Sequence, residues 1–156
     1  MRYPNQVINP KVIERCDIEA LIPHRAPHLW IDRVEELEPG VRCVAVKFVD
    51  PANPVFAGHF PDKPILPGVF LIEAMAQTAG VMLGAAMPQA KHSGGTGVAL
   101  LAAVNRFKFL KPVTPGQELR VETKKLTEVG QLAYIGGTVS VGAVMVANGE
   151  LSVVLG

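Results

Sequence analysis

Apolar residues are concentrated in one long run in the middle of the chain, and Glu73 is the only formal charge within it. After the turn-forming pair Pro67-Gly68, the composition from Val69 to Met87 favours a helix of about 20 residues, and Pro88 ends it. Such a helix is about 30 Å long. Because it is apolar nearly all round, we expect it to be buried on most sides.

Alternating apolar and polar residues before and after this run predict β-strands. The expected strands are Leu29–Leu37, Val41–Val49, Val98–Leu110, Glu118–Glu128, Leu132–Val141 and Val144–Leu155. Glu38-Pro39-Gly40 joins the first two into a hairpin, and Asn148-Gly149 is expected to form a bulge or a second turn. A short helix is expected over Asp17–Ile22, capped by Asp17. We expect irregular backbone over residues 1–12 and a flexible connection over residues 89–97.

The order of strands, one long helix and further strands is typical of an α+β fold, not of alternating βαβ units. We therefore expect a single domain over residues 1–156, with one antiparallel sheet wrapped around one long central helix. One sheet covers only part of a helix that is apolar all round. The uncovered part predicts that a second copy of the chain packs against it.

Composition narrows the functional classes. The chain has 156 residues, 49% of them hydrophobic, and a formal net charge of +1, so no overall field draws it to nucleic acid or to an anionic membrane. Cys16 and Cys43 have neither metal-binding spacing nor a disulfide framework, which favours a reduced cytoplasm. The first residues lack the apolar core of a signal peptide. Glu73 and Gln77 argue against a membrane span over the long helix.

Two residues around the helix start are candidates for acid–base chemistry. His59 lies in a loop bounded by Gly58 and Pro61, and histidine is the side chain most readily used as a base near neutral pH. Glu73 follows 14 residues later, where a carboxylate is costly unless it is paired or protonated. A neutral buried glutamic acid is able to act as a general acid. From the residues alone, a purely structural role for each of them remains an equal alternative.

Gly68 and Gln77 are candidates for supporting roles near these two residues. Gly68 precedes the first helical turn, where unpaired N–H groups and the positive end of the helix dipole can polarise a carbonyl. The alternative is that Gly68 simply starts the helix. Gln77 lies one turn after Glu73 on the same face, so it either hydrogen-bonds Glu73 or satisfies itself elsewhere.

Other polar clusters carry weaker signals. His24 and His28 are four residues apart, but Pro27 lies between them, so a helical metal-binding pair is not expected and we predict no metal site. The glycine-rich stretch at 92–97 lacks the Walker pattern and its strand-then-helix context. The basic residues of the segment 106–111 alternate with phenylalanines that we expect to face the core. These bases face either solvent or an acidic partner.

Several of these motifs together resemble a known family. The segments PHR-x-P at 23–27, GHFPDKPILPGV at 58–69, EAMAQTAG at 73–80 and FKFLKPVTPGQEL at 107–119 are similar to the β-hydroxyacyl-acyl carrier protein dehydratases of the FabZ type. The glutamate, in place of an aspartate, resembles the FabZ type more than the FabA type. The resemblance covers about residues 18–125. It implies the hot-dog fold, in which an antiparallel sheet wraps a long central helix.

The resemblance also implies a site and its chemistry. His59 matches the catalytic base, Glu73 the catalytic acid, and Gly68 the residue whose N–H holds the thioester carbonyl. Family members are homodimers, often assembled as trimers of dimers, whose sites take the histidine from one subunit and the carboxylate from the other. The resemblance implies no metal and no redox cofactor. The substrate is carried on the phosphopantetheine of an acyl carrier protein. The residues expected to line the acyl tunnel are Leu21, Ile22, Pro23, His24, Phe60, Leu100 and Leu101.

The chain departs from the family pattern beside these residues. Ala26-Pro27-His28 stands where the family often has Tyr-Pro-Phe, and Leu100-Leu101 stands where a tyrosine often gates the tunnel. These departures leave the chemistry residues in place. Two alternatives to a dehydratase are a hot-dog thioesterase and a non-catalytic hot-dog protein that binds acyl chains or a partner.

Overall fold

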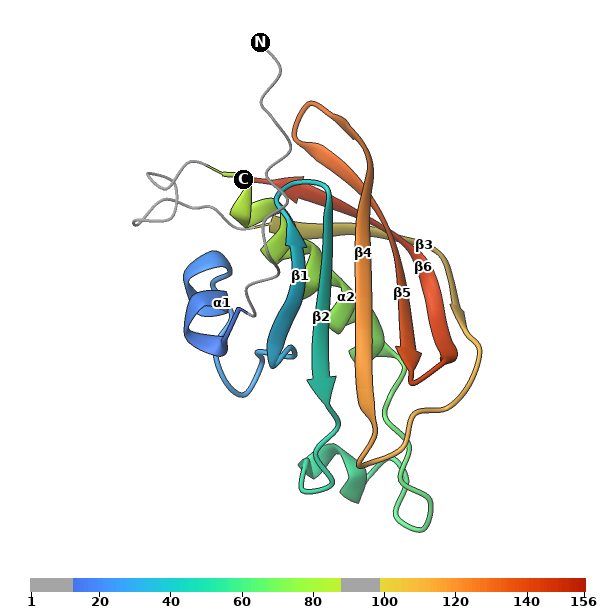
Figure 1. Cartoon of the computed structure of the whole chain (residues 1–156). Helices are drawn as coiled ribbons and strands as arrows, with labels where there is room; N and C mark the ends of the chain where they lie inside the picture. The colour runs from blue at the N-terminus through green and yellow to red at the C-terminus, as the bar shows by residue number, and fades with distance from the viewer. Residues whose placement is uncertain (1–12, 88–98) are drawn as a thin grey trace.

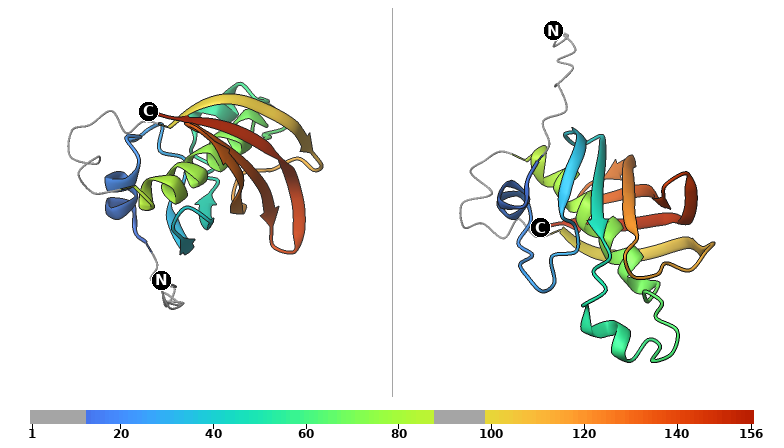
Figure 2. Two further views of the ribbon diagram at one scale, coloured as in Figure 1. Left: turned by 90° about the horizontal axis from the view of Figure 1, so that it is seen from above. Right: turned by 60° about the horizontal axis from the view of Figure 1, so that its bottom comes forward.

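One antiparallel sheet curves around one long helix in the computed structural model, which describes residues 13–87 and 99–156 (Figures 1 and 2). The sheet has six strands in the order β1-β2-β4-β5-β6-β3. The elements are α1 (Arg15–Leu21), β1 (Arg33–Glu38), β2 (Arg42–Phe48), the short 3₁₀ helix η1 (Pro54–Ala57), α2 (Val69–Ala85), β3 (Ala99–Phe109), β4 (Glu118–Val129), β5 (Leu132–Val141) and β6 (Val144–Leu155). The expected α+β architecture is confirmed. The expectations for residues 1–12 and 89–97 lie outside the described residues.

The helix α2 is held by the concave face of the sheet, as its apolar composition predicts. Met75, Ala79 and Met82 are fully buried, and they belong to one core cluster with sheet residues such as Val121 and Ile135. Apolar surface removed from water stabilises the fold by about 25 cal/mol per Å². Among the described residues, no helix combines the length and the hydropathy that crossing a membrane requires. The N-terminal end of α2 is less covered, and Val69 is 65% exposed.

The predicted ranges and the observed elements differ most at the beginning of α1 and of β1. The first helix begins at Arg15 with Glu14 as its N-cap, so the expected cap at Asp17 is wrong. Asp17 lies in the first turn instead, where a carboxylate interacts favourably with the helix dipole. The first strand begins at Arg33 and not at residue 29, because the backbone N–H of Trp30 donates to the side chain of Gln77 and not to a neighbouring strand.

Asn148-Gly149 forms no turn, because both residues lie inside β6 and pair with β5. The bulge lies in the opposite strand, β3, where the register with β6 shifts between Asn105 and Lys108. Arg106 takes a positive φ of 51° there. A Cβ at Gly149 would lie 2.4 Å from the ring of Phe107. Phe107 packs on the core, but Phe109 is 53% exposed, so the expectation that both rings face the core is wrong for Phe109.

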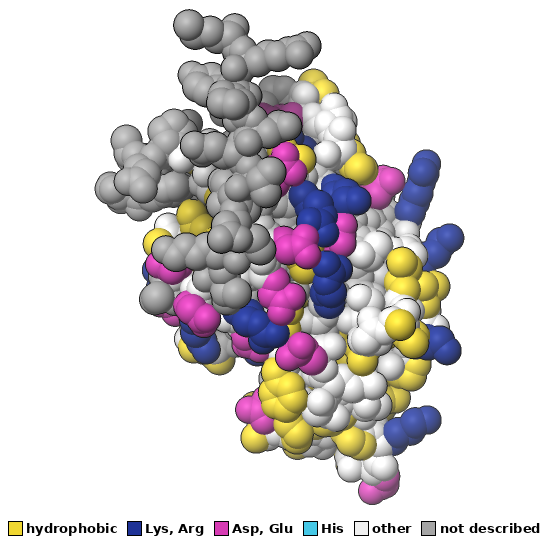
Figure 3. All heavy atoms as spheres, viewed as in Figure 1, with side chains coloured by type: hydrophobic (Ala, Val, Ile, Leu, Met, Phe, Trp, Pro, Cys, Tyr) yellow, Lys and Arg dark blue, Asp and Glu magenta, His cyan; other side chains and the backbone are white. Residues whose placement is uncertain are grey.

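Acidic and basic side chains interleave over the outer face of β1, β2 and β4 (Figure 3). Arg42 donates to Glu122 over 3.0 Å and also to Glu36. Arg120 bridges the same two carboxylates over 3.2 and 3.3 Å. The hydrogen bond from Arg42 is the largest of the effects that lower the pKa of Glu122, to about 2 from an ordinary 4.5.

We predict that α1 and α2 tolerate no added atom where they cross. A Cβ at Gly84 would lie 2.6 Å from the backbone oxygen of Leu21, which cannot move without shifting α1. Gly84→Ala should therefore lower the free energy of unfolding by about 1–3 kcal/mol in urea titrations. The control is Gly80→Ala on the same helix, where the nearest atom is a side-chain methyl of Ile22 at 3.2 Å. Equal losses for the two variants would contradict this account.

We also predict that the charge network gives the stability a pH dependence. The folded state favours ionised Glu122, so its contribution is fully present above about pH 4.5 and is lost as the pH falls towards 2. Glu122→Gln should cost about 1 kcal/mol at pH 7 and progressively less below pH 4.5. Chemical unfolding at a series of pH values measures this difference. A difference that stays constant down to pH 2 would refute it.

Candidate active site

A cavity of about 260 Å³ lies between the end of α1, the middle of α2 and the beginning of β3. Glu73 lies on its wall. Among the residues expected in an acyl tunnel, Leu21, Ile22, Pro23, His24, Leu100 and Leu101 all line it. Phe60 does not line it and is 49% exposed, in the loop of His59. The wall is completed by His28, Ala76, Gly80, Leu83, Gly84, Met87, Ala99 and Val153.

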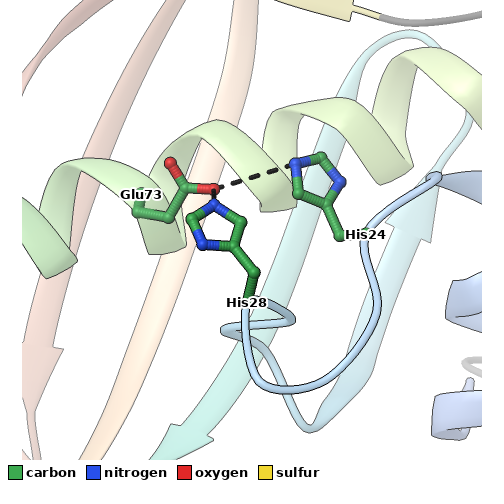
Figure 4. Close-up of side chains that lie close together, drawn as sticks. All are labelled: His24, His28 and Glu73. Carbon is green, nitrogen blue, oxygen red and sulfur yellow. Dashed lines mark ion pairs between the residues drawn. The ribbon is translucent and has the colours of Figure 1, made fainter.

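The imidazoles of His24 and His28 both point toward the Glu73 carboxylate at this cavity (Figure 4). The Glu73 Oε1 atom lies 3.1 Å from His28 Nε2 and 3.8 Å from His24 Nε2. Gln77 Nε2 donates a hydrogen bond to the same oxygen over 2.7 Å. The Glu73 side chain remains 29% exposed. The carboxyl group is therefore both held by the protein and open to a ligand in the cavity.

Gln77 positions Glu73 and the preceding loop together. Its side chain is almost completely buried, at 1% exposure. Besides Glu73, its NH₂ group donates to the backbone oxygen of His28 over 2.8 Å, and its Oε1 accepts from Trp30 N over 2.7 Å. Of the two alternatives that the sequence left open for Gln77, both hold: it donates to Glu73, and the loop satisfies its other polar groups. Because both ends of the amide are used, the side chain has one favourable orientation.

The two histidines meet at Glu73 through a turn and not through a helix. His24 and His28 stack with ring centroids 5.8 Å apart and planes inclined by 15°. Arg25 anchors this turn, because its guanidinium donates to Ile22 O and Glu19 O at the end of α1. The sequence reasoning considered only a helical pair, which Pro27 excludes, and it therefore missed this arrangement. The signal available in the sequence was the spacing of His24 and His28, four residues apart with Pro27 between them.

The environment of His24 disfavours its protonated form. Burial lowers its pKa below the ordinary 6.5, and the negative charge of Glu73 opposes that effect only in part. Its Nδ1 atom is buried and has no hydrogen-bond partner among the described residues. The neutral imidazole therefore leaves a lone pair on one ring nitrogen.

His59 lies in a second hollow, of about 430 Å³, at the N-terminal end of α2. Its Nδ1 is 2.7 Å from the backbone oxygen of Ile65. A carbonyl oxygen only accepts, so Nδ1 carries the proton and Nε2 of the neutral ring has a free lone pair. The ring stacks on Phe60, and its loop is closed by a hydrogen bond from Ile65 N to His59 O over 3.0 Å. This geometry suits a general base.

Gly68 shares the hollow of His59 and forms the N-cap of α2. A Cβ at this position would lie 2.7 Å from the ring of Phe109, so a larger residue would require that exposed ring to move. The Gly68 N–H donates to no acceptor among the described residues. An oxyanion placed there would meet an N–H donor and the positive end of the helix dipole.

Within one chain, His59 and Glu73 do not face the same space. No residue lines both hollows. The base and the acid expected from the sequence are therefore brought together only if a second copy of the chain supplies one of them.

The described residues define the class of protein: a sheet wrapped around one buried helix is the hot-dog fold. A family model for the FabA-like domain matches residues 22–150. The chain belongs to this FabA-like family of hot-dog proteins, and its relatives are of the FabZ type.

Two of these relatives are named 3-hydroxyacyl-[acyl-carrier-protein] dehydratase FabZ. The protein from Solibacter usitatus is 41% identical over 140 residues, which cover 90% of this chain and 83% of that protein. The protein from Roseiflexus sp. is 42% identical over 135 residues, with coverages of 86% and 91%.

Solved structures show the same fold at low identity. The dehydratase heterocomplex ApeI:P from Xenorhabdus doucetiae matches with a TM-score of 0.71 and 19% identity, over 89% of this chain and 90% of that chain. A hypothetical thioesterase with coenzyme A from Streptococcus pneumoniae matches with a TM-score of 0.59 and 10% identity, over 79% and 84%.

We predict that Gln77 is required for the stability of this site. Gln77→Leu should lower the free energy of unfolding by about 2–3 kcal/mol, because it leaves the buried N–H of Trp30 without an acceptor. The matched control is Thr78→Val, a neighbouring buried position whose hydroxyl donates only to Ala74 O, over 2.7 Å. That change should cost less than about 1 kcal/mol, since the Ala74 carbonyl still accepts within the helix. Similar losses in urea denaturation would contradict the special role of Gln77.

Proposed function

We propose that the chain removes water from a β-hydroxyacyl thioester, carried on an acyl carrier protein, and forms the trans-2-enoyl thioester. The observation that carries the proposal is the His59 hollow, which His59, with a free Nε2 lone pair, and Gly68 both line, in a chain of the FabA-like family. Relatives about 40% identical over most of their length bear the dehydratase name. The pathway that this activity serves is fatty acid biosynthesis or a related pathway to polyketide or polyene lipids.

A homodimer is the proposed active unit. β3 is the terminal strand of the sheet, so one of its edges lacks a strand partner in the described chain. It is also unusually apolar on its exposed side, where Leu100 is 63% exposed and Val104 40%. An exposed apolar edge strand is a template for pairing with a second chain. Such pairing would cover the N-terminal end of α2 and place His59 of one copy near Glu73 of the other. Three such dimers would then assemble into a trimer of dimers.

The proposed reaction divides acid and base between the two copies. His59 Nε2 takes the proton from the carbon next to the thioester carbonyl. The Gly68 N–H stabilises the negative charge that develops on the carbonyl oxygen. As the carbon–carbon double bond forms, the bond to the β-hydroxyl breaks, and that hydroxyl leaves as water with the proton of Glu73. His59 ends protonated and Glu73 ionised, and exchange with solvent restores both. None of these steps requires a cofactor.

The apolar end of the substrate would occupy the cavity of Glu73. Its wall is largely aliphatic, with Leu21, Leu83 and Val153 among the lining residues. The carrier protein would dock near the hollow of His59, which Lys111 lines. Arg106 and Lys108 lie in β3, shortly before Lys111, and all three are exposed and form no ion pair with a described residue. A basic surface suits an acidic partner. We place the enzyme in the cytoplasm, where Cys43, which is buried and free, would stay reduced.

The test is the reverse reaction, the hydration of an enoyl thioester, followed by loss of the enoyl absorbance. Wild type should turn over, and His59→Ala and Glu73→Gln should each lower kcat/KM at least ~100-fold, because each removes one partner of the acid–base pair. Glu38→Gln, an equivalent change at an exposed position of β1, should leave kcat/KM unchanged.

Two outcomes would reject the dehydratase. Release of free thiol without loss of the double bond would support the thioesterase alternative. No turnover with thioesters of any chain length, by a folded dimer, would support a non-catalytic hot-dog protein that binds acyl chains or a partner.

A further inference from the structure

His24, His28 and Glu73 bring three metal-ligating atoms together at the cavity (Figure 4). The two histidine nitrogens and the carboxylate oxygen all lie within 4.8 Å of one another. The dehydration proposed above uses only Glu73 of the three. The two histidines therefore have no assigned chemistry, although both aim their Nε2 atoms at the same oxygen.

The spacing is close to that of a zinc site. Bonds from Zn²⁺ to histidine nitrogen and carboxylate oxygen are about 2.0–2.1 Å long, so the ligand atoms of a tetrahedral site lie about 3.3 Å apart. His28 Nε2 and Glu73 Oε1 are already 3.1 Å apart. His24 Nε2 is 3.8 Å from the same oxygen, and the two histidine nitrogens lie within 4.8 Å of each other, so the set must close by about 0.5–1.5 Å. The His28 side chain is 71% exposed and is therefore free to adjust.

The ligands are held by a buried residue outside the set. The amide of Gln77 donates both to the Glu73 carboxylate, over 2.7 Å, and to the backbone oxygen of His28, over 2.8 Å. One side chain thus holds the Glu73 carboxylate directly and fixes the backbone of the turn that carries His28, while the His28 imidazole remains free to move. Groups that orient the ligands in this way are typical of metal centres and contribute strongly to their affinity.

We propose that His24, His28 and Glu73 form a binding site for a divalent transition metal of the zinc type. Two imidazoles and one carboxylate are a donor set suited to Zn²⁺, and three protein ligands leave a coordination position open towards the cavity. His28 occupies the position where the resemblance to the FabZ type leads one to expect phenylalanine. The site is thus a property of this chain and not of the family pattern.

Metal binding would switch the enzyme off, a consequence that rests on the proposed function. A carboxylate bound to a metal ion carries no proton to give to the departing hydroxyl. The ion also fills the part of the cavity into which the substrate would extend. Zinc is therefore an inhibitor of this chain and not a participant in its reaction.

The test is direct metal binding by the tag-free full-length dimer after treatment with a chelator. Co²⁺ serves as the probe, because four- or five-coordinate Co²⁺ absorbs visible light far more strongly than the hydrated ion. We expect one equivalent per chain to give the intense band, and Zn²⁺ to displace it. His28→Phe should weaken binding at least ~10-fold. Glu73→Gln should also weaken Co²⁺ binding at least ~10-fold. The new amide keeps an oxygen that accepts the hydrogen bond from Gln77, so this variant should still fold.

The matched control is His92→Ala, which removes a histidine that is not part of the three-residue set. It should bind Co²⁺ as wild type does. The proposal is overturned if wild type shows only the weak band of hydrated Co²⁺, or if His28→Phe and Glu73→Gln both bind as tightly as wild type.

The hydration assay separates this proposal from the proposed function. If both hold, Zn²⁺ inhibits wild type at the concentrations that displace Co²⁺, a chelator restores turnover, and His28→Phe is at least ~10-fold less sensitive. Turnover without Co²⁺ binding would reject the metal site and keep the dehydratase. An intense Co²⁺ band in a protein that never turns over would keep the metal site and reject the dehydratase.

Discussion

The structure depends on how a carboxyl group is held on a helix that is otherwise uncharged and mostly apolar. Glu73 interrupts the buried helix α2, where an unpaired charge would be costly. Gln77, one turn later, supplies the hydrogen bond, and its own amide is held by Trp30 N and His28 O. The segment before β1 is therefore fixed by the site as much as by the sheet. The buried amide of Gln77 thus holds both the segment before β1 and the carboxyl group of Glu73.

The helix α2 also sets the distance between two groups that we propose act on the substrate, the Gly68 N–H and the Glu73 carboxyl group. Gly68 is its N-cap, and Glu73 lies in its second turn. Gly68 opens into the hollow of His59, while Glu73 faces the cavity behind α1. The base and the acid that we propose line separate hollows of one chain, so within that chain they do not face one substrate. The exposed apolar strand β3 gives a physical reason for a second copy to bring them together.

Periodicity was enough to predict the long helix, the strands and the wrapping of one by the other, because burial of apolar faces determines all three. Local polar contacts were harder to predict. Asp17 is a good capping residue, yet α1 begins at Arg15 and Glu14 is its N-cap, without a capping hydrogen bond from the side chain. The start of β1 depends on a hydrogen bond across 47 residues, from Trp30 to Gln77. The meeting of His24 and His28 at Glu73 depends on a turn whose shape no periodicity reports.

The central claim is that one active site takes His59 and Glu73 from different copies. The most direct test is a mixed dimer of His59→Ala and Glu73→Gln, purified through two different affinity tags after co-expression. Each parent is expected to be inactive, but the mixed dimer retains one site with both residues intact. It should therefore recover about half of the wild-type hydration activity. A mixed dimer as inactive as its parents would contradict the shared site.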